Sequence, residues 1–202
     1  QGTNTDIFGQ NLSSSGGQDI FIAKLSSTGN LIWVRKSWNT LSDYGYSTTI
    51  DSSDNIILTG FFQWTNTDIF WTPMTSSGTN DVFIAKLTST GNLIWVKKWW
   101  GTSSDIGQSV MSDSSGNILV TWQFQGTDTD LFGQSLSSSG SSDAYIVKLS
   151  STGNLMWVKK WWNTWVDRTY SISTNSSWSI LVTWQFQGTG TDLFGENLST
   201  SG

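Results

Sequence analysis

The chain has 202 residues, of which 12% are charged, its net charge is −5, and it contains neither cysteine nor histidine. The low negative charge offers nucleic acid no basic surface, and the missing residue types exclude disulfides, thiol chemistry, the usual zinc sites and histidine acid–base catalysis. The sequence has no apolar run of about 18 residues, the length that a membrane-spanning helix needs, so it predicts no membrane span.

One internal repeat organises the whole chain. The motif TGNLIWV begins at Thr28 and Thr90, and TGNLMWV begins at Thr152, so that successive copies are separated by the same step in sequence. That step also aligns two columns of aspartates, Asp19, Asp81 and Asp143, and Asp6, Asp68, Asp130 and Asp192. We therefore divide the chain into the end of a preceding repeat (1–16) and three full repeats, 17–78, 79–140 and 141–202. Because the chain begins with Gln1 and not with Met, we expect it to be a piece of a longer protein.

The residue pattern of each repeat predicts four short strands and no helix. The first strand is expected near 46–50, and the segment DSSDN at 51–55 contains residue types that favour a tight turn. The second strand, at 117–125 in the next copy, is rich in β-branched and aromatic residues. A polar loop at 126–142, a third strand at 143–150, a hairpin turn at 151–154 and a fourth strand at 155–160 complete the unit. This succession predicts an all-β, propeller-type repeat array of four-stranded antiparallel blades, with an open superhelical or fibre-forming β stack as the alternative.

The turn DSSGN, the strand DAYIVKLS and the strand GNLMWVKK resemble the bacterial SBBP-type β-propeller repeats of secreted and cell-surface proteins. The resemblance covers essentially the whole chain. It implies a propeller fold, an extracellular or cell-surface location, and a role in binding or scaffolding.

Tryptophan is the main departure from that resemblance, with 14 residues in the chain. Trp33, Trp95 and Trp157 share one column of the fourth strand, and we expect them to be structural core anchors between blades. The other eleven stand where glycine occurs in another copy, or where the resembling family is rich in glycine after the fourth strand. They are Trp38, Trp64, Trp71, Trp99, Trp100, Trp122, Trp161, Trp162, Trp165, Trp178 and Trp184.

Three interpretations of these eleven positions stay open. Glycine serves where the backbone needs a positive φ or a close approach, and a side chain there is strained. The first interpretation is therefore that the codon is UGA, read as glycine by some bacterial lineages and written as tryptophan under another code. The second is a genuine binding surface of exposed indoles, and the third is random drift.

Other chemistry is sparse. Asp51 and Asp113 lie in turns that could be read as cation loops, but calcium needs roughly six to eight oxygen ligands, so we expect them to cap hairpin turns. Lys24, Lys86 and Lys148 in the third strands are expected to form a solvated stripe, and the aspartates of the TDIF and TDLF motifs to order the long loop. No catalytic, metal-binding or cofactor-binding residue is assigned.

Three repeats are too few for a closed propeller, which uses about four to eight blades. We therefore expect either continuation of the array in a longer chain or self-association, with two chains in a six-bladed ring or many chains in a fibre. The predicted function is that of a non-enzymatic extracellular or cell-surface protein in adhesion, scaffolding or protein binding, with a surface protein or a glycan as partner. The alternatives are a carbohydrate-binding module that uses exposed tryptophans such as Trp100 and Trp162, and a hydrolase built on a propeller.

Overall fold

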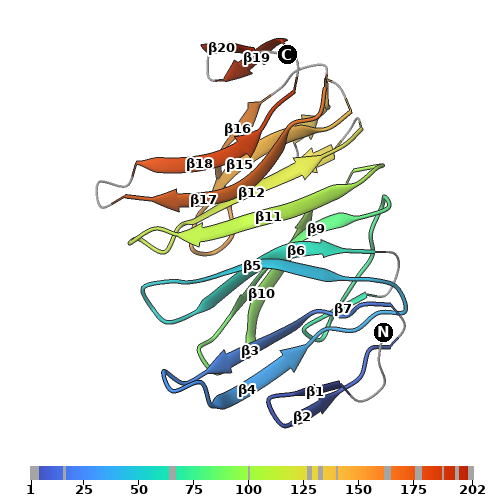
Figure 1. Cartoon of the computed structure of the whole chain (residues 1–202), viewed down its shortest axis with the longest axis vertical. Helices are drawn as coiled ribbons and strands as arrows, with labels where there is room; N and C mark the ends of the chain where they lie inside the picture. The colour runs from blue at the N-terminus through green and yellow to red at the C-terminus, as the bar shows by residue number, and fades with distance from the viewer. Residues whose placement is uncertain are drawn as a thin grey trace.

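The computed structural model of the protein describes residues 5–15, 17–63, 67–99, 101–126, 129–131, 134–139, 141–161, 165–175, 179–187, 189–193 and 196–199. Within these ranges the regular elements are β-strands, which form antiparallel sheets stacked along the long axis of the molecule (Figure 1). The chain is therefore all-β, as the sequence predicts. No helix in these ranges has the length and apolar character needed to cross a membrane.

Two of the sheets have four strands each. Sheet 1 contains β5 (Tyr44–Ile50), β6 (Ile56–Phe62), β9 (Asp81–Leu87) and β10 (Leu93–Trp99). Sheet 2 contains β11 (Asp105–Ser112), β12 (Ile118–Phe124), β15 (Asp143–Leu149) and β16 (Leu155–Trp161). The two middle pairs have the same register, since Ile56 faces Leu87 in sheet 1 and Ile118 faces Leu149 in sheet 2. Each sheet thus contains the four predicted strands, but it takes its first and second strands from one repeat and its third and fourth strands from the next.

Two further sheets contain two long strands each. The N-terminal pair is β3 (Phe21–Leu25) with β4 (Leu31–Lys36), and the C-terminal pair is β17 (Arg168–Thr174) with β18 (Ile180–Gln185). By their places in the repeat, β3 and β4 correspond to β9 and β10, whereas β17 and β18 correspond to β5 and β6. The first pair is therefore the second half of a four-stranded sheet and the other pair is the first half. They lie at opposite ends of the stack (Figure 1).

A short hairpin lies between the second and third long strands of each repeat, where the sequence predicts only a polar loop. The hairpins are β1 (Thr5–Ile7) with β2 (Gln10–Leu12), β7 (Thr67–Ile69) with β8 (Thr72–Met74), β13 (Thr129–Leu131) with β14 (Gln134–Leu136), and β19 (Thr189–Leu193) with β20 (Glu196–Ser199). The backbone N–H of Gly9 donates to the Asp6 carboxylate at 2.9 Å, and that of Trp71 donates to Asp68 at 2.5 Å. These two aspartates order the hairpin turn as expected; the side chains of Asp130 and Asp192 lie outside the described part.

The hydrophobic cores lie between neighbouring sheets. Every residue of β6 and β12 is buried, so these strands present both faces to other sheets. Leu58 of β6 belongs to the core shared with the N-terminal pair, and its neighbour Ile57 belongs to the core shared with sheet 2. Because successive side chains of a strand point to opposite faces, the continuous apolar run of this strand fills two cores at once.

The first strands of successive sheets lie side by side. The backbone N–H of Val110 in β11 donates to Ser47 Oγ in β5 at 3.2 Å, and that of Ile172 in β17 donates to Ser109 Oγ in β11 at 3.3 Å. The fourth strands, β10 and β16, form the opposite edge of their sheets. The described strands do not close into a ring.

Candidate functional site

Neighbouring sheets are joined where the third strand of one and the first strand of the next begin. One backbone hydrogen bond recurs at each joint: Asp43 N to Gln18 O at 2.6 Å, Asp105 N to Asn80 O at 2.8 Å, and Asp167 N to Ser142 O at 2.9 Å. Each joint contains two aspartates, which we name the joint carboxylates: Asp19 with Asp43, Asp81 with Asp105, and Asp143 with Asp167. Sequence reasoning misses the second member of each pair, although Asp43, Asp105 and Asp167 also recur at the step of the repeat.

Burial makes three of these carboxylates, those of Asp43, Asp81 and Asp105, hold their protons more tightly than free aspartate does. Removal from water raises the pKa of Asp105 to about 8, and the neighbouring Asp81 carboxylate adds to the effect. Burial likewise raises the pKa of Asp43 to about 7 and that of Asp81 to about 6. Raised carboxyl pKa values can mark acid–base catalysts. Here the same arrangement recurs from joint to joint, which ties it to the contact between sheets.

A second repeated cluster lies at the turn between the first and second strands. Asp51 accepts backbone hydrogen bonds from Ser53 at 2.8 Å and from Asn55 at 2.9 Å, as expected for an aspartate that caps a turn. Its other oxygen lies 2.8 Å from Lys86 Nζ, and both side chains are buried. Burial alone would raise the pKa of Asp51, but the hydrogen bonds from Lys86 and Asn55 outweigh it and hold the pKa at about 2. The oxygens of this turn are therefore already occupied by donors of the chain itself.

The predicted solvated stripe of lysines is wrong. Lys86 is 6% exposed, and Lys148, with a side chain 22% exposed, lies 2.9 Å from Asp113. Lys86 also donates to the carbonyl of Ser151 in the turn of the following sheet at 3.1 Å, and Lys24 makes the equivalent bond to Ser89 at 3.1 Å. The ammonium groups of Lys24 and Lys86 therefore tie their strands to the next sheet.

The three tryptophans of the fourth strands are half-buried between sheets. Trp33 packs against the core between the N-terminal pair and sheet 1, Trp95 against the core between the two large sheets, and Trp157 against the core before the C-terminal pair. Trp33 Nε1 also donates to the carbonyl of Ser89 in sheet 1 at 3.2 Å. This column thus lies at contacts between sheets.

Four of the eleven remaining tryptophans form two stacked pairs. The rings of Trp99 and Trp122 are 5.8 Å apart with planes 11° apart, and those of Trp161 and Trp184 are 5.7 Å apart with planes 23° apart. We expected Trp99 and Trp161 in the connection after the fourth strand. Instead β10 and β16 extend to include them, and they are only 3% and 1% exposed, because each indole packs on the second strand of the next sheet.

At the first joint the same two positions hold small residues, Ser37 and Gly60. A Cβ on Gly60 would lie 1.8 Å from the carbonyl oxygen of Tyr44, so this strand approaches β5 too closely for any side chain. In sheet 2 the equivalent residue is Trp122, which is 1% exposed. Small and large residues therefore change together at these two positions: one copy has serine and glycine, and the next has two stacked tryptophans.

Three of the eleven are exposed, namely Trp38, Trp71 and Trp165, at 44%, 59% and 52%. Among the described tryptophans, Trp71 alone has a left-handed backbone, with φ +68°, and the equivalent residue of the first hairpin is Gly9 with φ +78°. The remaining four, Trp64, Trp100, Trp162 and Trp178, lie outside the described residues.

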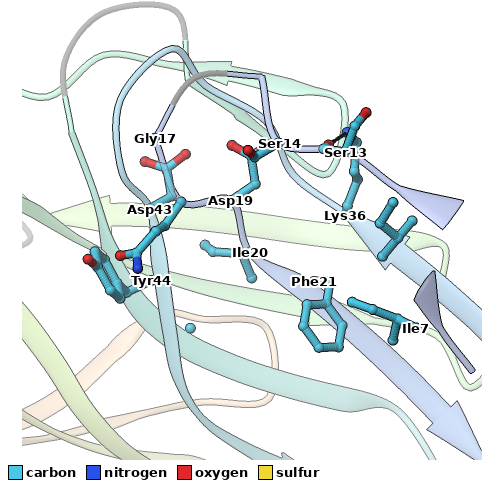
Figure 2. Close-up of a pocket in the computed structure, with 13 residues that line it drawn as sticks. Ile7, Ser13, Ser14, Gly17, Asp19, Ile20, Phe21, Lys36, Asp43 and Tyr44 are labelled. Carbon is cyan, nitrogen blue, oxygen red and sulfur yellow. Dashed lines mark hydrogen bonds between the residues drawn. The ribbon is translucent and has the colours of Figure 1, made fainter. Parts of the chain in front are cut away.

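The N-terminal joint opens into a pocket of about 390 Å³, which we name the edge pocket. Figure 2 shows the carboxylates of Asp19 and Asp43 on one side of it, and Ile7, Ile20 and Phe21 on the other. Leu12 of the first hairpin also lines it. The edge pocket thus has an apolar floor beside a pair of joint carboxylates.

A second hollow, of about 460 Å³, lies at the fourth strand of the N-terminal pair, and we name it the tryptophan pocket. Trp38 and Trp71 line it together with Arg35, Lys36 and Asn92. Lys36 Nζ is 5.2 Å from the ring centre of Trp38. Two exposed indoles therefore stand beside hydrogen-bond donors in one shallow cavity.

No protein-family model matches the chain. The chain is 27% identical over 210 residues to an uncharacterized WD repeat-containing protein of Acanthamoeba polyphaga mimivirus, a match that covers 89% of this chain and 15% of that protein. In structure it is similar to a protein of unknown function from Bacteroides caccae, with a TM-score of 0.52 and 14% identity over 94% of this chain and 57% of that one. The chain spans a minor part of the first protein and just over half of the second. The likeness to a repeat-containing protein agrees with an all-β repeat chain.

Proposed function

We propose that the chain is a propeller-type β-repeat module of the SBBP kind, that it works outside the cell or on its surface, and that it acts in adhesion, scaffolding or protein binding without catalysis. The arrangement of the sheets supports the fold in this proposal, because first strands that lie side by side are typical of blades around an axis. The likeness to a protein described by its WD repeats is in keeping with it.

The observation that carries the proposed function is the use of the repeated polar groups. The backbone hydrogen bonds of Asp43, Asp105 and Asp167 at the joints, the buried Asp51–Lys86 pair and the bond from Lys86 to Ser151 all connect one sheet with itself or with the next. Side chains that recur in this way build a scaffold of constant geometry. Its variable surfaces are then free to bind partners, as in other repeat proteins.

A binding screen tests this function. The purified chain is immobilised and probed with arrays of extracellular proteins and of glycans, and in parallel is incubated with ester, peptide and glycoside substrates. We expect saturable binding to members of an array and no turnover. Turnover that is lost on replacing a joint carboxylate, as in Asp43→Asn, would refute the non-enzymatic role.

A carbohydrate-binding module is the second candidate, and the tryptophan pocket favours it. The C–H face of a sugar packs on an indole ring, and Arg35 and Asn92 can donate hydrogen bonds to hydroxyl groups at the same site. Trp38→Ala is expected to abolish glycan binding, whereas Trp165→Ala, which removes another exposed indole, leaves it unchanged. Equal effects of the two substitutions, or no glycan binding by the unaltered chain, exclude this candidate.

A further inference from the structure

We propose that β18 of one copy of this chain pairs with β3 of a second copy, and that two copies close reciprocally into a ring of six four-stranded sheets. In the described residues the long strands of each copy form two complete four-stranded sheets and two half sheets, so two copies supply four complete and two composite ones. The resulting number lies within the range of about four to eight blades found in closed propellers. The inference concerns assembly of the chain and is independent of the molecule it binds.

The two edges match because the chain already contains their pairing twice. In the described residues β3 pairs with β4 alone and β18 with β17 alone, whereas β6–β9 and β12–β15 are paired along their length. Transferring that register to the equivalent residues gives the expected pairs of β18 with the partner β3: Ile180 with Leu25, Leu181 with Lys24, Val182 with Ala23, Thr183 with Ile22, and Trp184 with Phe21. An edge with unpaired N–H and C=O groups is a template for such a strand.

Side chains on both edges are exposed although their equivalents are buried. Phe21 is 47% exposed, whereas Phe83 and Tyr145 at the same position of β9 and β15 are fully buried. On the other edge Leu181 is 56% exposed, whereas Leu119 at the same position of β12 is 1% exposed. Large apolar side chains are thus exposed at both ends of the stack, whereas their equivalents in the middle sheets are covered by a neighbouring strand or sheet.

The edge pocket lies where an aromatic ring is buried in the equivalent part of sheet 1. In sheet 1, Phe62 at the end of β6 is fully buried in a core that includes Ile69, Met74 and Phe83. The residues equivalent to those three are Ile7, Leu12 and Phe21, and all three line the edge pocket. The residue equivalent to Phe62 at the other end of the chain is Phe186. We infer that Phe186 of the second copy fills this pocket.

Geometry makes the contact one between copies. The N-terminal and C-terminal pairs lie at opposite ends of the stack, with sheets 1 and 2 between them (Figure 1), so β3 and β18 of one copy do not meet. The free edge of β3 can pair with the free edge of β18. A dimer with two-fold symmetry therefore pairs both edges of both copies at once.

Light scattering on the 202-residue chain tests the proposal, because the expected dimer has twice the 22.3 kDa mass of the chain. Phe21→Lys and Leu181→Lys each put a charge on one edge at an exposed position, so they leave the single copy folded and are each expected to give monomers. Ile94→Lys, which alters a fourth-strand residue that is 46% exposed, is the matched control and keeps the dimer.

Mixing the two edge variants provides the sharper readout. The Phe21→Lys chain keeps an intact β18 and the Leu181→Lys chain an intact β3, so an equimolar mixture is expected to form a 1:1 complex that neither variant forms alone. An unaltered chain that stays monomeric at high micromolar concentration, which leaves the edges to further repeats or to another partner, overturns the proposal. So do open-ended larger assemblies, a dimer that both edge variants retain, or a mixture that stays monomeric.

Discussion

Glycine and tryptophan change places in this chain because two of the affected positions face each other across a joint. Trp122 stacks on Trp99 across one joint, and in the copy where Gly60 leaves no room for a Cβ, the residue equivalent to Trp99 is Ser37. Stacked indoles occupy the space between sheets at one joint, whereas in the other copy the backbone of Gly60 lies close to β5 of its own sheet. At these positions the packing depends on the combined volume of the two side chains and not on the size of either one alone.

Trp71 is a different case, since its backbone is left-handed and its ring is 59% exposed. A residue with a Cβ costs about 1–2 kcal/mol in this region relative to glycine. Trp71→Gly is therefore expected to raise the free energy of unfolding by about 1 kcal/mol in urea denaturation. Trp165→Gly is the control, because Trp165 has no positive φ and glycine there lowers stability through the freedom of the unfolded chain. A loss of stability in both variants would contradict the assignment of strain to Trp71.

The recoding of UGA stays a prediction. It expects UGA at most of the eleven variable tryptophan positions and UGG at Trp33, Trp95 and Trp157. Sequencing the gene decides between the interpretations, and UGG at all fourteen positions rules recoding out.

Within each sheet the ion pair at the first turn connects three strands. Lys86→Met removes one partner of the buried pair and leaves the Asp51 carboxylate uncompensated, so it is expected to cost about 3–5 kcal/mol of stability. Lys148→Met breaks the equivalent pair, whose lysine side chain is 22% exposed, and should cost clearly less. Urea unfolding of the two variants measures both values, and equal losses would contradict the role given to burial.

Sequence patterns predict the long strands well because β-branched and aromatic residues and Asp-Ser-Gly-Asn turns act locally. They miss the hairpin at β7–β8 because each of its strands has only 3 residues, and its turn places Trp71 where local rules expect glycine. The lysine prediction fails because burial of Lys86 in β9 depends on Asp51, which lies in the turn between β5 and β6, three strands before β9 in the chain. The joint carboxylates are hidden for the same reason: Asp81 and Asp105 meet only after two sheets have stacked.

For the whole molecule, the joints predict an unusual dependence of stability on pH. The pKa of Asp105 is raised from 3.8 to about 8 on folding, so the native state binds more protons than the unfolded state between these values. The contribution of this group is fully present below about pH 4 and is lost as the pH rises toward 8, and Asp43 and Asp81 act in the same direction. Asp51 acts oppositely, since its pKa of about 2 contributes stability that is lost only as the pH falls below 3.8.

Thermal unfolding from pH 4 to pH 9 measures this dependence. We expect the melting temperature to fall with rising pH in the unaltered chain, and to fall less in Asp105→Asn, whose amide carries no charge at any of these values. A melting temperature that rises from pH 4 to pH 8 would show that the joint carboxylates are not desolvated in solution.

The assembly of two copies through their sheet edges is tested most directly by a disulfide, since the chain has no cysteine of its own. A chain carrying Ala23→Cys and Val182→Cys places the two thiols opposite each other in the register of Leu58 with Ala85 and Val120 with Val147. Oxidation is expected to link it into covalent dimers. A chain carrying Ala23→Cys and Leu181→Cys points its second thiol to the other face and should stay unlinked. Unlinked chains in the first variant, or equal linking in both, would contradict the composite sheet.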